Sequence, residues 1–344
     1  MIHIPSTQTG SAPLSQMACA ALGTLILAAG PTAATAQTQD RLAEIAAFFS
    51  AADVISGPEV VDCTLSGGAE TECFSITVSG SPQDYTPGPW CPTNISQGPE
   101  AGGIWLEDGE VHDVDGDFIA NLAEFYGDSK WQLFDPDTGD VRYTGTLEAC
   151  EAAARPDVAE EYQNYCVQCL PEYVSDDRTL TYVIPLEPVA ADAPGQTNRS
   201  GSGVAYNGVR LDGPAPVDAI LGAYTIAAFD DCGGHINPHV GYHYHAVTDC
   251  LEHSPAEPVS DGHGAQIGIA MDGHAIMPHT MADGSHPEGL DACNGHAEDG
   301  GLYHYHAGAA GSNAILGCLS AQAGCVLDSP DATCDASAMR GPRP

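Results

Sequence analysis

The segment Gly241-Tyr-His-Tyr-His-Ala246 decides how the C-terminal half of this chain folds, because it recurs as Tyr303-His-Tyr-His-Ala307. A cysteine, a glycine and a histidine precede each copy at the same spacing, as Cys232-Gly-Gly-His235 and as Cys293-Asn-Gly-His296. Identical spacing in two copies is not expected by chance. We therefore interpret the pattern as an internal duplication.

A further pair of similar segments lies upstream, Gly203-Val-Ala-Tyr-Asn-Gly208 before the first motif and Gly268-Ile-Ala-Met-Asp-Gly273 before the second. If the motifs are strands, alternate side chains point to opposite faces. The two histidines of each motif then share one face and the two tyrosines the other. We expect the tyrosines to pack into the core and the imidazoles to face a common cavity.

Histidine is the commonest protein ligand of zinc, copper, iron and nickel. If the two copies pack around a pseudo-twofold axis, four imidazoles converge on one site. The stability order of divalent ions then favours copper, with zinc as its competitor. The predicted metal ligands are His243, His245, His304 and His306, with His235 and His296 as the next candidates.

Two aspartates and five further histidines lie in the same region. Asp272 and Asp291 could supply carboxylates, either as ligands or as hydrogen-bond partners that orient a ring. Histidines without a partner in the repeat are expected to be structural, in line with the intermediate burial of this residue type. They are His253, His263, His274, His279 and His286.

Two alternatives to metal binding and storage remain open. One is a metal-dependent enzyme, in which three histidines hold an ion, a coordination position stays open for water and Asp272 acts as a base. The sequence contains no HExxH motif and no serine-nucleophile elbow that would support it. The other is a structural or surface module in which the His and Tyr side chains only form core hydrogen bonds.

The charge of the chain excludes several partners. It has 47 acidic residues against 9 basic ones, a formal net charge of -38. No basic stripe could release counterions from phosphates, so nucleic acid is excluded as a partner. A diffuse negative field raises the local concentration of cations, which suits a metal ion as the partner.

The N-terminus and the cysteines indicate export. Residues 17–29 are apolar and of the length of a signal h-region, and small residues follow up to Ala36, so we expect cleavage after Ala36 although no Lys or Arg precedes Arg41. Cys19 lies inside this segment, which leaves 12 cysteines, an even number typical of a disulfide framework. Beyond the signal, no segment could span a bilayer. The expected location is periplasmic or secreted.

Two local pairs of cysteines allow more specific predictions. Cys63 and Cys73 flank a plausible hairpin tip and are expected to lie close together. Cys166 and Cys169 form a single CxxC without the second pair that a four-sulfur zinc site needs, so a structural disulfide is favoured.

The remaining pattern is that of a mainly β protein with a few short helices, braced by disulfides. A short amphipathic helix is expected over 40–52, half-buried strands over 74–78 and 180–184, helix over 146–165 broken at Pro156, and a loop over 190–203. The run Asp113-Val-Asp-Gly-Asp117 lacks the glycine at the sixth position of a calcium loop and is expected to be a solvated turn.

The expected organisation is a signal peptide over 1–36, a short helix or linker over 37–58, a β-rich part over 59–190, the duplicated core over 197–325 and a tail over 326–344.

The motifs resemble those of the YHYH-domain family of exported bacterial proteins. The resemblance rests on 241–246, on Leu290-Asp-Ala-Cys-Asn-Gly-His296 and on the second motif, and extends to 203–209, 231–235 and the turn at 82–90. It covers the chain from about residue 60 to 325. The family is named for its motif, so the resemblance implies export but no established activity. Both motifs are intact here, which favours a symmetric site.

Overall fold

The structure is a computed structural model that describes residues 33–155, 157–175, 177–197, 200–252, 262–297, 301–329 and 332–338. The chain divides into two compact units, residues 1–39 and 40–344, and every strand belongs to the second. Up to residue 32, the predicted signal segment lies outside the described residues, as does Cys19. None of the described helices is long and apolar enough to cross a membrane.

The fold is mainly β, as expected. One sheet has four strands in the order β1, β2, β6 and β18, and another has eight in the order β11, β12, β9, β8, β13, β14, β16 and β15. The first comprises β1 (Val54–Thr64), β2 (Glu70–Val78), β6 (Leu180–Pro185) and β18 (Cys325–Leu327). The second comprises β11 (Gly234–Asn237), β12 (Gly241–Tyr244), β9 (Arg210–Leu211), β8 (Gly203–Ala205), β13 (Gly268–Ala270), β14 (Ala275–Met277), β16 (His304–His306) and β15 (Gly295–His296).

Three two-stranded ladders and short helices complete the architecture. The ladders are β10 (Ile226–Ala227) with β5 (Cys166–Val167), β17 (Leu319–Ala321) with β7 (Ala190–Gly195), and β3 (Ile104–Glu107) with β4 (Glu110–Asp113). The α-helices are α1 (Ala33–Phe48), α2 (Gly116–Phe125), α3 (Leu147–Ala153), α4 (Val217–Gly222) and α5 (Asp249–Glu252). Single 3-10 turns occur at Phe49–Ala51, Pro99–Ala101, Glu160–Tyr162, Pro171–Tyr173 and Ala310–Ser312.

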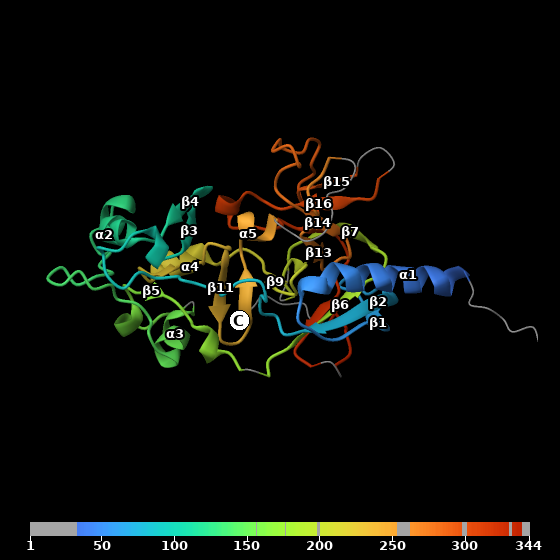
Figure 1. Ribbon diagram of the computed structural model, residues 1–344, viewed down its shortest axis with the longest axis horizontal. Coiled ribbons are helices and arrows are strands. Elements are labelled where there is room, and N and C mark those ends of the chain that lie inside the picture. Colours follow the sequence, from blue (N-terminus) through green and yellow to red (C-terminus); the bar gives the residue numbers. More distant parts are fainter. Residues whose placement is uncertain are drawn as a thin grey trace, which may run out of the picture. The chain divides into compact units, whose positions relative to one another are not determined.

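The eight-stranded sheet has the same pairing pattern when followed from either edge. Its two central strands, β8 and β13, pair antiparallel. On each side the next pairing is an antiparallel hairpin, then a parallel pair that brings in a Tyr-His-Tyr-His strand, then an antiparallel edge strand. Figure 1 shows β13, β14, β16 and β15 stacked in this order in the orange-to-red part of the ribbon.

The turn that leads into each edge strand explains the Cys-x-Gly-His pattern. Gly233 and Asn294 occupy equivalent positions and both have positive φ, +79° and +61°. Glycine adopts this left-handed conformation freely and asparagine tolerates it better than most residues. The next residue, Gly234 or Gly295, faces the first tyrosine of the motif so closely that a Cβ atom would lie 2.2 Å or 2.0 Å from the hydroxyl oxygen.

Several local predictions are confirmed and others are wrong. Helix α1 with its 3-10 extension covers the predicted helix over 40–52, and β2 and β6 cover the two predicted strands. However, β6 is buried along its whole length rather than on one face. The predicted loop over 190–203 instead begins with β7, which pairs with β17 near the end of the chain.

The acidic run at 113–117 caps a helix. Asp115 accepts a hydrogen bond from the N–H of Phe118 at 2.8 Å and so begins α2. A carboxylate at this position satisfies one of the free amide groups of the first turn. The structure therefore gives this residue a local role, where a solvated turn was expected.

Six disulfides join the 12 cysteines that follow Cys19. They are Cys63–Cys73, Cys91–Cys166, Cys150–Cys169, Cys232–Cys250, Cys293–Cys318 and Cys325–Cys334. The predicted proximity of Cys63 and Cys73 is confirmed. The two cysteines of the CxxC pair are in disulfides, but with distant partners and not with each other, because Cys166 lies in β5 and Cys169 faces α3.

Candidate metal centres

The first group of histidines is built by the hairpin of β11 and β12. His235 and His243 lie directly opposite each other in the antiparallel pair, and their Nε2 atoms are 3.1 Å apart. His245 follows on the same face of the strand. One potential ligand atom from each of the three lies within 4.8 Å of the others. Strand alternation thus places these imidazoles together, as the motif predicts.

Backbone carbonyl oxygens and the ring of Phe229 hold the imidazoles of this group in place. His243 Nδ1 lies 3.0 Å from the carbonyl oxygen of Gly241, and His245 Nδ1 lies 2.6 Å from that of Gly213. A carbonyl oxygen only accepts, so each Nδ1 carries the proton and each Nε2 of a neutral ring presents its lone pair. Phe229 packs against His235 and His245, with ring centroids 4.9 and 5.3 Å away.

Burial favours the uncharged form of His235 and His243. His243 is 3% exposed and His245 5% exposed. Desolvation, reinforced by the neighbouring His245, lowers the pKa of His243 to about 3, and desolvation also lowers the pKa of His235 well below its ordinary value. Neutral imidazole is the form that binds metals.

The second group contains four histidines. His296 and His304 lie opposite each other in β15 and β16, as His235 and His243 do in the first hairpin, and their Nε2 atoms are 3.0 Å apart. His306 is the other histidine of the motif. His263 joins them from a segment bridged to Met281, with its Nε2 atom 3.1 Å from that of His304. Potential ligand atoms of all four lie within 4.8 Å of one another.

Backbone carbonyls hold the outer nitrogens of this group too. The Nδ1 atoms of His296, His304 and His306 lie 2.9, 3.1 and 2.7 Å from the carbonyl oxygens of Glu288, Leu302 and Pro278. Each ring therefore donates at Nδ1, and in its neutral form each points the lone pair of Nε2 inward. Such outer hydrogen bonds are what fix the tautomer and orientation of metal-binding histidines.

His306 has a buried nitrogen without a partner. Its side chain is fully buried, and among the described residues Nε2 makes no hydrogen bond. Desolvation lowers the pKa of His306 to about 4, so the ring is neutral near pH 7. A buried polar atom left unsatisfied costs about 1–3 kcal/mol, and native structures contain few of them.

The tyrosines occupy the other face of each motif strand, as predicted. Tyr242 and Tyr244 hydroxyls both contact the hydroxyl of Tyr85, at 2.9 and 2.6 Å, and Tyr242 also donates to the buried carboxylate of Asp230. Tyr305 donates to the fully buried Asp272 at 2.6 Å. In the structure Asp272 therefore supports a tyrosine of the second motif.

Asp291 has the same role in the second copy that Asp230 has in the first. It accepts hydrogen bonds from the Tyr303 hydroxyl at 2.8 Å and from the N–H groups of Cys293 and Gly295. Asp291 thus closes the turn before β15 and supports a tyrosine. Neither it nor Asp272 belongs to the histidine groups.

The six predicted ligands all lie in the two groups, but the four motif histidines do not converge on one site. The motif strands β12 and β16 are five positions apart in the sheet, so at the usual strand spacing roughly 20 Å separates them. Each motif instead lies in its own group of histidines. One residue that we expected to be structural, His263, lies in the second group.

The other histidines without a repeat partner lie elsewhere. His274 donates from Nδ1 to the carbonyl oxygen of Tyr303 and His279 to that of Ala307, while His286 contacts the ring of His279. His253 lies outside the described residues. Nothing in the local spacing distinguishes His263 from these, since its position depends on a segment between the two copies.

The two groups differ in composition. Beside the first, Asp212 places a carboxylate oxygen 3.9 Å from His243 Nε2, and its other oxygen accepts from Arg210 at 3.0 Å. Met277 and Ala275 are the equivalent residues beside the second. The first group thus has three imidazoles and a paired carboxylate, whereas the second has four imidazoles.

Comparison with known protein families finds a match for the region that holds the first group of histidines. A family model described as YHYH protein matches residues 181–287. Residues 181–287 are thus similar to the YHYH protein family. The match includes the first Tyr-His-Tyr-His segment and His263 but ends before the second segment, so it is shorter than the expected 60–325. No curated protein and no solved structure matches the chain.

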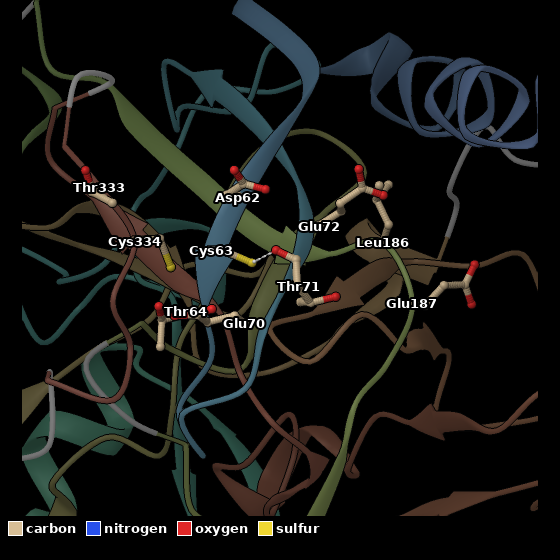
Figure 2. Close-up of a pocket in the computed structure, with 10 residues that line it drawn as sticks. All are labelled: Asp62, Cys63, Thr64, Glu70, Thr71, Glu72, Leu186, Glu187, Thr333 and Cys334. Carbon is tan, nitrogen blue, oxygen red and sulfur yellow. Dashed lines mark hydrogen bonds between the residues drawn. The ribbon is translucent and has the colours of Figure 1, made fainter. Parts of the chain in front are cut away.

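A pocket of about 730 Å³ has no histidine of either group in its lining. Figure 2 shows the carboxylates of Asp62, Glu72 and Glu187 around it, contributed by β1, β2 and the segment after β6. Glu70 and two disulfide-bonded cysteines also line it, and no histidine does. The pocket is therefore not part of either group.

Proposed function

We propose that this protein is an exported metal-binding protein that holds two transition-metal ions, one in each histidine group. Copper is the first candidate and zinc the second, because an all-imidazole site binds copper most tightly among the common divalent ions. The role would be binding, storage or delivery of the ion. Disulfide-bonded cysteines are unavailable as thiolates, which leaves nitrogen and oxygen donors.

The observation that carries this proposal is the approach of His296 to His304. Both rings donate at Nδ1 to carbonyl oxygens, so two neutral rings would aim lone pairs at each other over 3.0 Å. Two lone pairs at that distance repel. A cation between them turns the repulsion into coordination. Two nitrogens that share an ion at about 2.05 Å are about 2.9–3.4 Å apart for angles between square and tetrahedral.

The other two histidines of the second group, His263 and His306, also support a bound ion. His263 Nε2 lies 3.1 Å from His304 Nε2, within the same range, and the buried Nε2 of His306 is otherwise unsatisfied. An ion at this position would supply a partner for His306 Nε2, which makes no hydrogen bond among the described residues. The group offers four imidazole donors, whereas the first offers three, with Asp212 as the nearest carboxylate.

A purely structural network of His and Tyr hydrogen bonds is the competing explanation. In the first group it requires only that His235 donate from Nε2 to His243. In the second group, one ring of the His296–His304 pair must carry protons on both nitrogens. This network predicts that metal changes neither the stability nor the composition of the protein.

Elemental analysis of untagged protein, secreted into an oxidising compartment, tests the proposal. We expect two copper or zinc ions per chain. A variant with His243→Ala and His245→Ala should retain one, as should a variant with His304→Ala and His306→Ala. His274→Ala is the matched control, because this imidazole lies outside both groups, and should retain two. Protein without stoichiometric metal, and without a thermal shift on adding copper or zinc, would refute the proposal.

Export is supported by the six disulfides, which form and persist in oxidising compartments. The predicted signal peptide is tested by N-terminal sequencing of the secreted protein. The expected first residue is Gln37. A secreted chain that keeps residues 1–36 would refute the predicted cleavage.

A further inference from the structure

A second pocket lies directly beside the four-histidine group. It has a volume of about 280 Å³, and the residues around it include His279, His286, Leu290, Asn294 and Ala307. At about 30 Å³ per water molecule, this volume can hold a metal ion with its inner hydration shell. None of the seven histidines of the two groups lines it.

The imidazoles of His279 and His286 lie close together in this pocket. Their ring centroids are 5.1 Å apart, within the 4.5–5.7 Å found between rings inside the two histidine groups. His279 donates from Nδ1 to the carbonyl oxygen of Ala307 at 3.0 Å, which fixes its tautomer and leaves the Nε2 lone pair available. His279 is half-buried and His286 is exposed, so the pair is open to solvent.

The wall of the pocket shares its backbone with the four-histidine group. Pro278, whose carbonyl oxygen accepts from His306 Nδ1, precedes His279. The backbone carbonyl oxygen of Asn294 accepts a hydrogen bond from the backbone N–H of His306 at 2.8 Å. The segment that carries His286 also carries Glu288, whose carbonyl oxygen holds His296. An ion bound in the pocket is thus next to the elements that position two of the four imidazoles, those of His296 and His306.

We propose that His279 and His286 form an acquisition site for a hydrated divalent cation, from which the ion passes to the four-histidine group. This inference rests on the proposed function. At the pair, two imidazole nitrogens replace two water ligands. The ion then exchanges these two nitrogens for those of the four-histidine group. The high negative charge of the chain raises the local cation concentration at such an exposed site.

The kinetics of metal loading test this proposal. Metal-free protein is mixed with copper(II) or zinc(II) bound to a weak chromophoric chelator, and the release of the chelator is followed by stopped-flow absorbance. The phase that is missing in the His304→Ala/His306→Ala variant reports the four-histidine group. In a His279→Asn/His286→Asn variant, we expect this phase to be slowed at least about tenfold, the smaller end of the effect of outer groups on metal sites.

The choice of asparagine keeps the fold intact. Its amide nitrogen can take the place of Nδ1 and still donate to the Ala307 carbonyl oxygen, while the Nε2 donor is lost. His239→Ala removes an exposed imidazole outside the pocket and should load as fast as the unsubstituted protein. Thermal unfolding of the metal-free variants checks that each has folded.

The outcomes separate this inference from the proposed function. Slower loading with two ions per chain at equilibrium supports the acquisition site. Unchanged loading with two ions per chain overturns it and leaves the proposed function standing. Loss of the second ion at equilibrium in the asparagine variant also overturns it, because His279 and His286 would then belong to the final site. Metal-free unsubstituted protein overturns the proposed function itself.

Discussion

Alanine in place of glycine should destabilise the two copies of the motif to very different extents, although the positions are equivalent. At Gly234 a Cβ atom would lie 2.2 Å from the hydroxyl oxygen of Tyr242, and at Gly295 it would lie 2.0 Å from that of Tyr303. Neither glycine has positive φ, so the added methyl group acts only through this contact.

The surroundings decide the cost of relieving each contact. Tyr242 is buried and its hydroxyl is bound by Asp230 and Tyr85, so it cannot move without leaving buried polar groups unsatisfied. Overpacking costs about 1–3 kcal/mol, and a lost buried partner about the same again, so Gly234→Ala should cost about 4 kcal/mol. Tyr303 is half-buried beside the exposed Asp291 and can turn towards solvent, so Gly295→Ala should cost about 1 kcal/mol.

Urea unfolding of the disulfide-intact, metal-free variants measures the difference. The variant Gly234→Ala/Tyr242→Phe is the internal check: a Cβ atom would also lie 2.3 Å from the ring carbon Cζ, and a ring without the hydroxyl has no hydrogen bonds that oppose its displacement. The two changes together should cost less than the sum of the single changes by about 1 kcal/mol or more. Equal losses of stability for Gly234→Ala and Gly295→Ala would show that packing around the tyrosines does not set the cost.

Three further perturbations follow from the buried polar groups and the disulfides. Burial raises the pKa of Asp230 to about 6, so its contribution to stability is full below pH 3.8 and is lost as the pH rises to about 6. The destabilisation caused by Asp230→Asn in urea unfolding should therefore be about 2 kcal/mol larger at pH 4 than at pH 7. Replacing Cys232 and Cys250 by serine opens a link of 18 residues and should lower the free energy of unfolding by about 3 kcal/mol. Tyr305→Phe leaves the fully buried Asp272 without its hydroxyl donor and should cost about 2 kcal/mol by the same assay.

For each of these variants, a contrary result would show which assumption about the residue is wrong. A pH-independent effect of Asp230→Asn would mean that this carboxylate titrates as it does in the unfolded chain. A disulfide variant of unchanged stability would mean that the link does not constrain the unfolded state. An unchanged Tyr305→Phe variant would mean that the remaining backbone donors, from His274 and Ala321, are sufficient for Asp272.

Predictions from local sequence succeeded where the interaction itself is local. Alternation along a strand places His243 and His245 on one face and their neighbouring tyrosines on the other, and a hairpin brings Cys63 to Cys73. The same logic explains why His235 and His296 lie opposite the motif histidines: a short turn joins the two strands of each hairpin. These contacts need no knowledge of the rest of the chain.

Predictions that needed the order of strands failed. The motif does not say that β8 and β13 form the centre of the sheet, and this order separates the two motif strands. The partners of Cys166 and Cys169, 75 and 19 residues away, are likewise set by tertiary packing. His263 enters the second group through a segment that has no counterpart in the first copy, so repeat spacing could not identify it.

The late position of β18 in the sequence determines when the four-stranded sheet can be completed during protein synthesis. Protein synthesis delivers β1, β2 and β6 long before residues 325–327, yet these residues pair with β6. Until then, the backbone hydrogen-bonding groups along one side of β6 have no strand beside them, and an open edge invites pairing with another chain. The growing polypeptide therefore carries an open strand edge from the synthesis of β6 until that of β18. A chain truncated before residue 325 keeps that edge permanently, and we expect self-association from the loss of a three-residue strand.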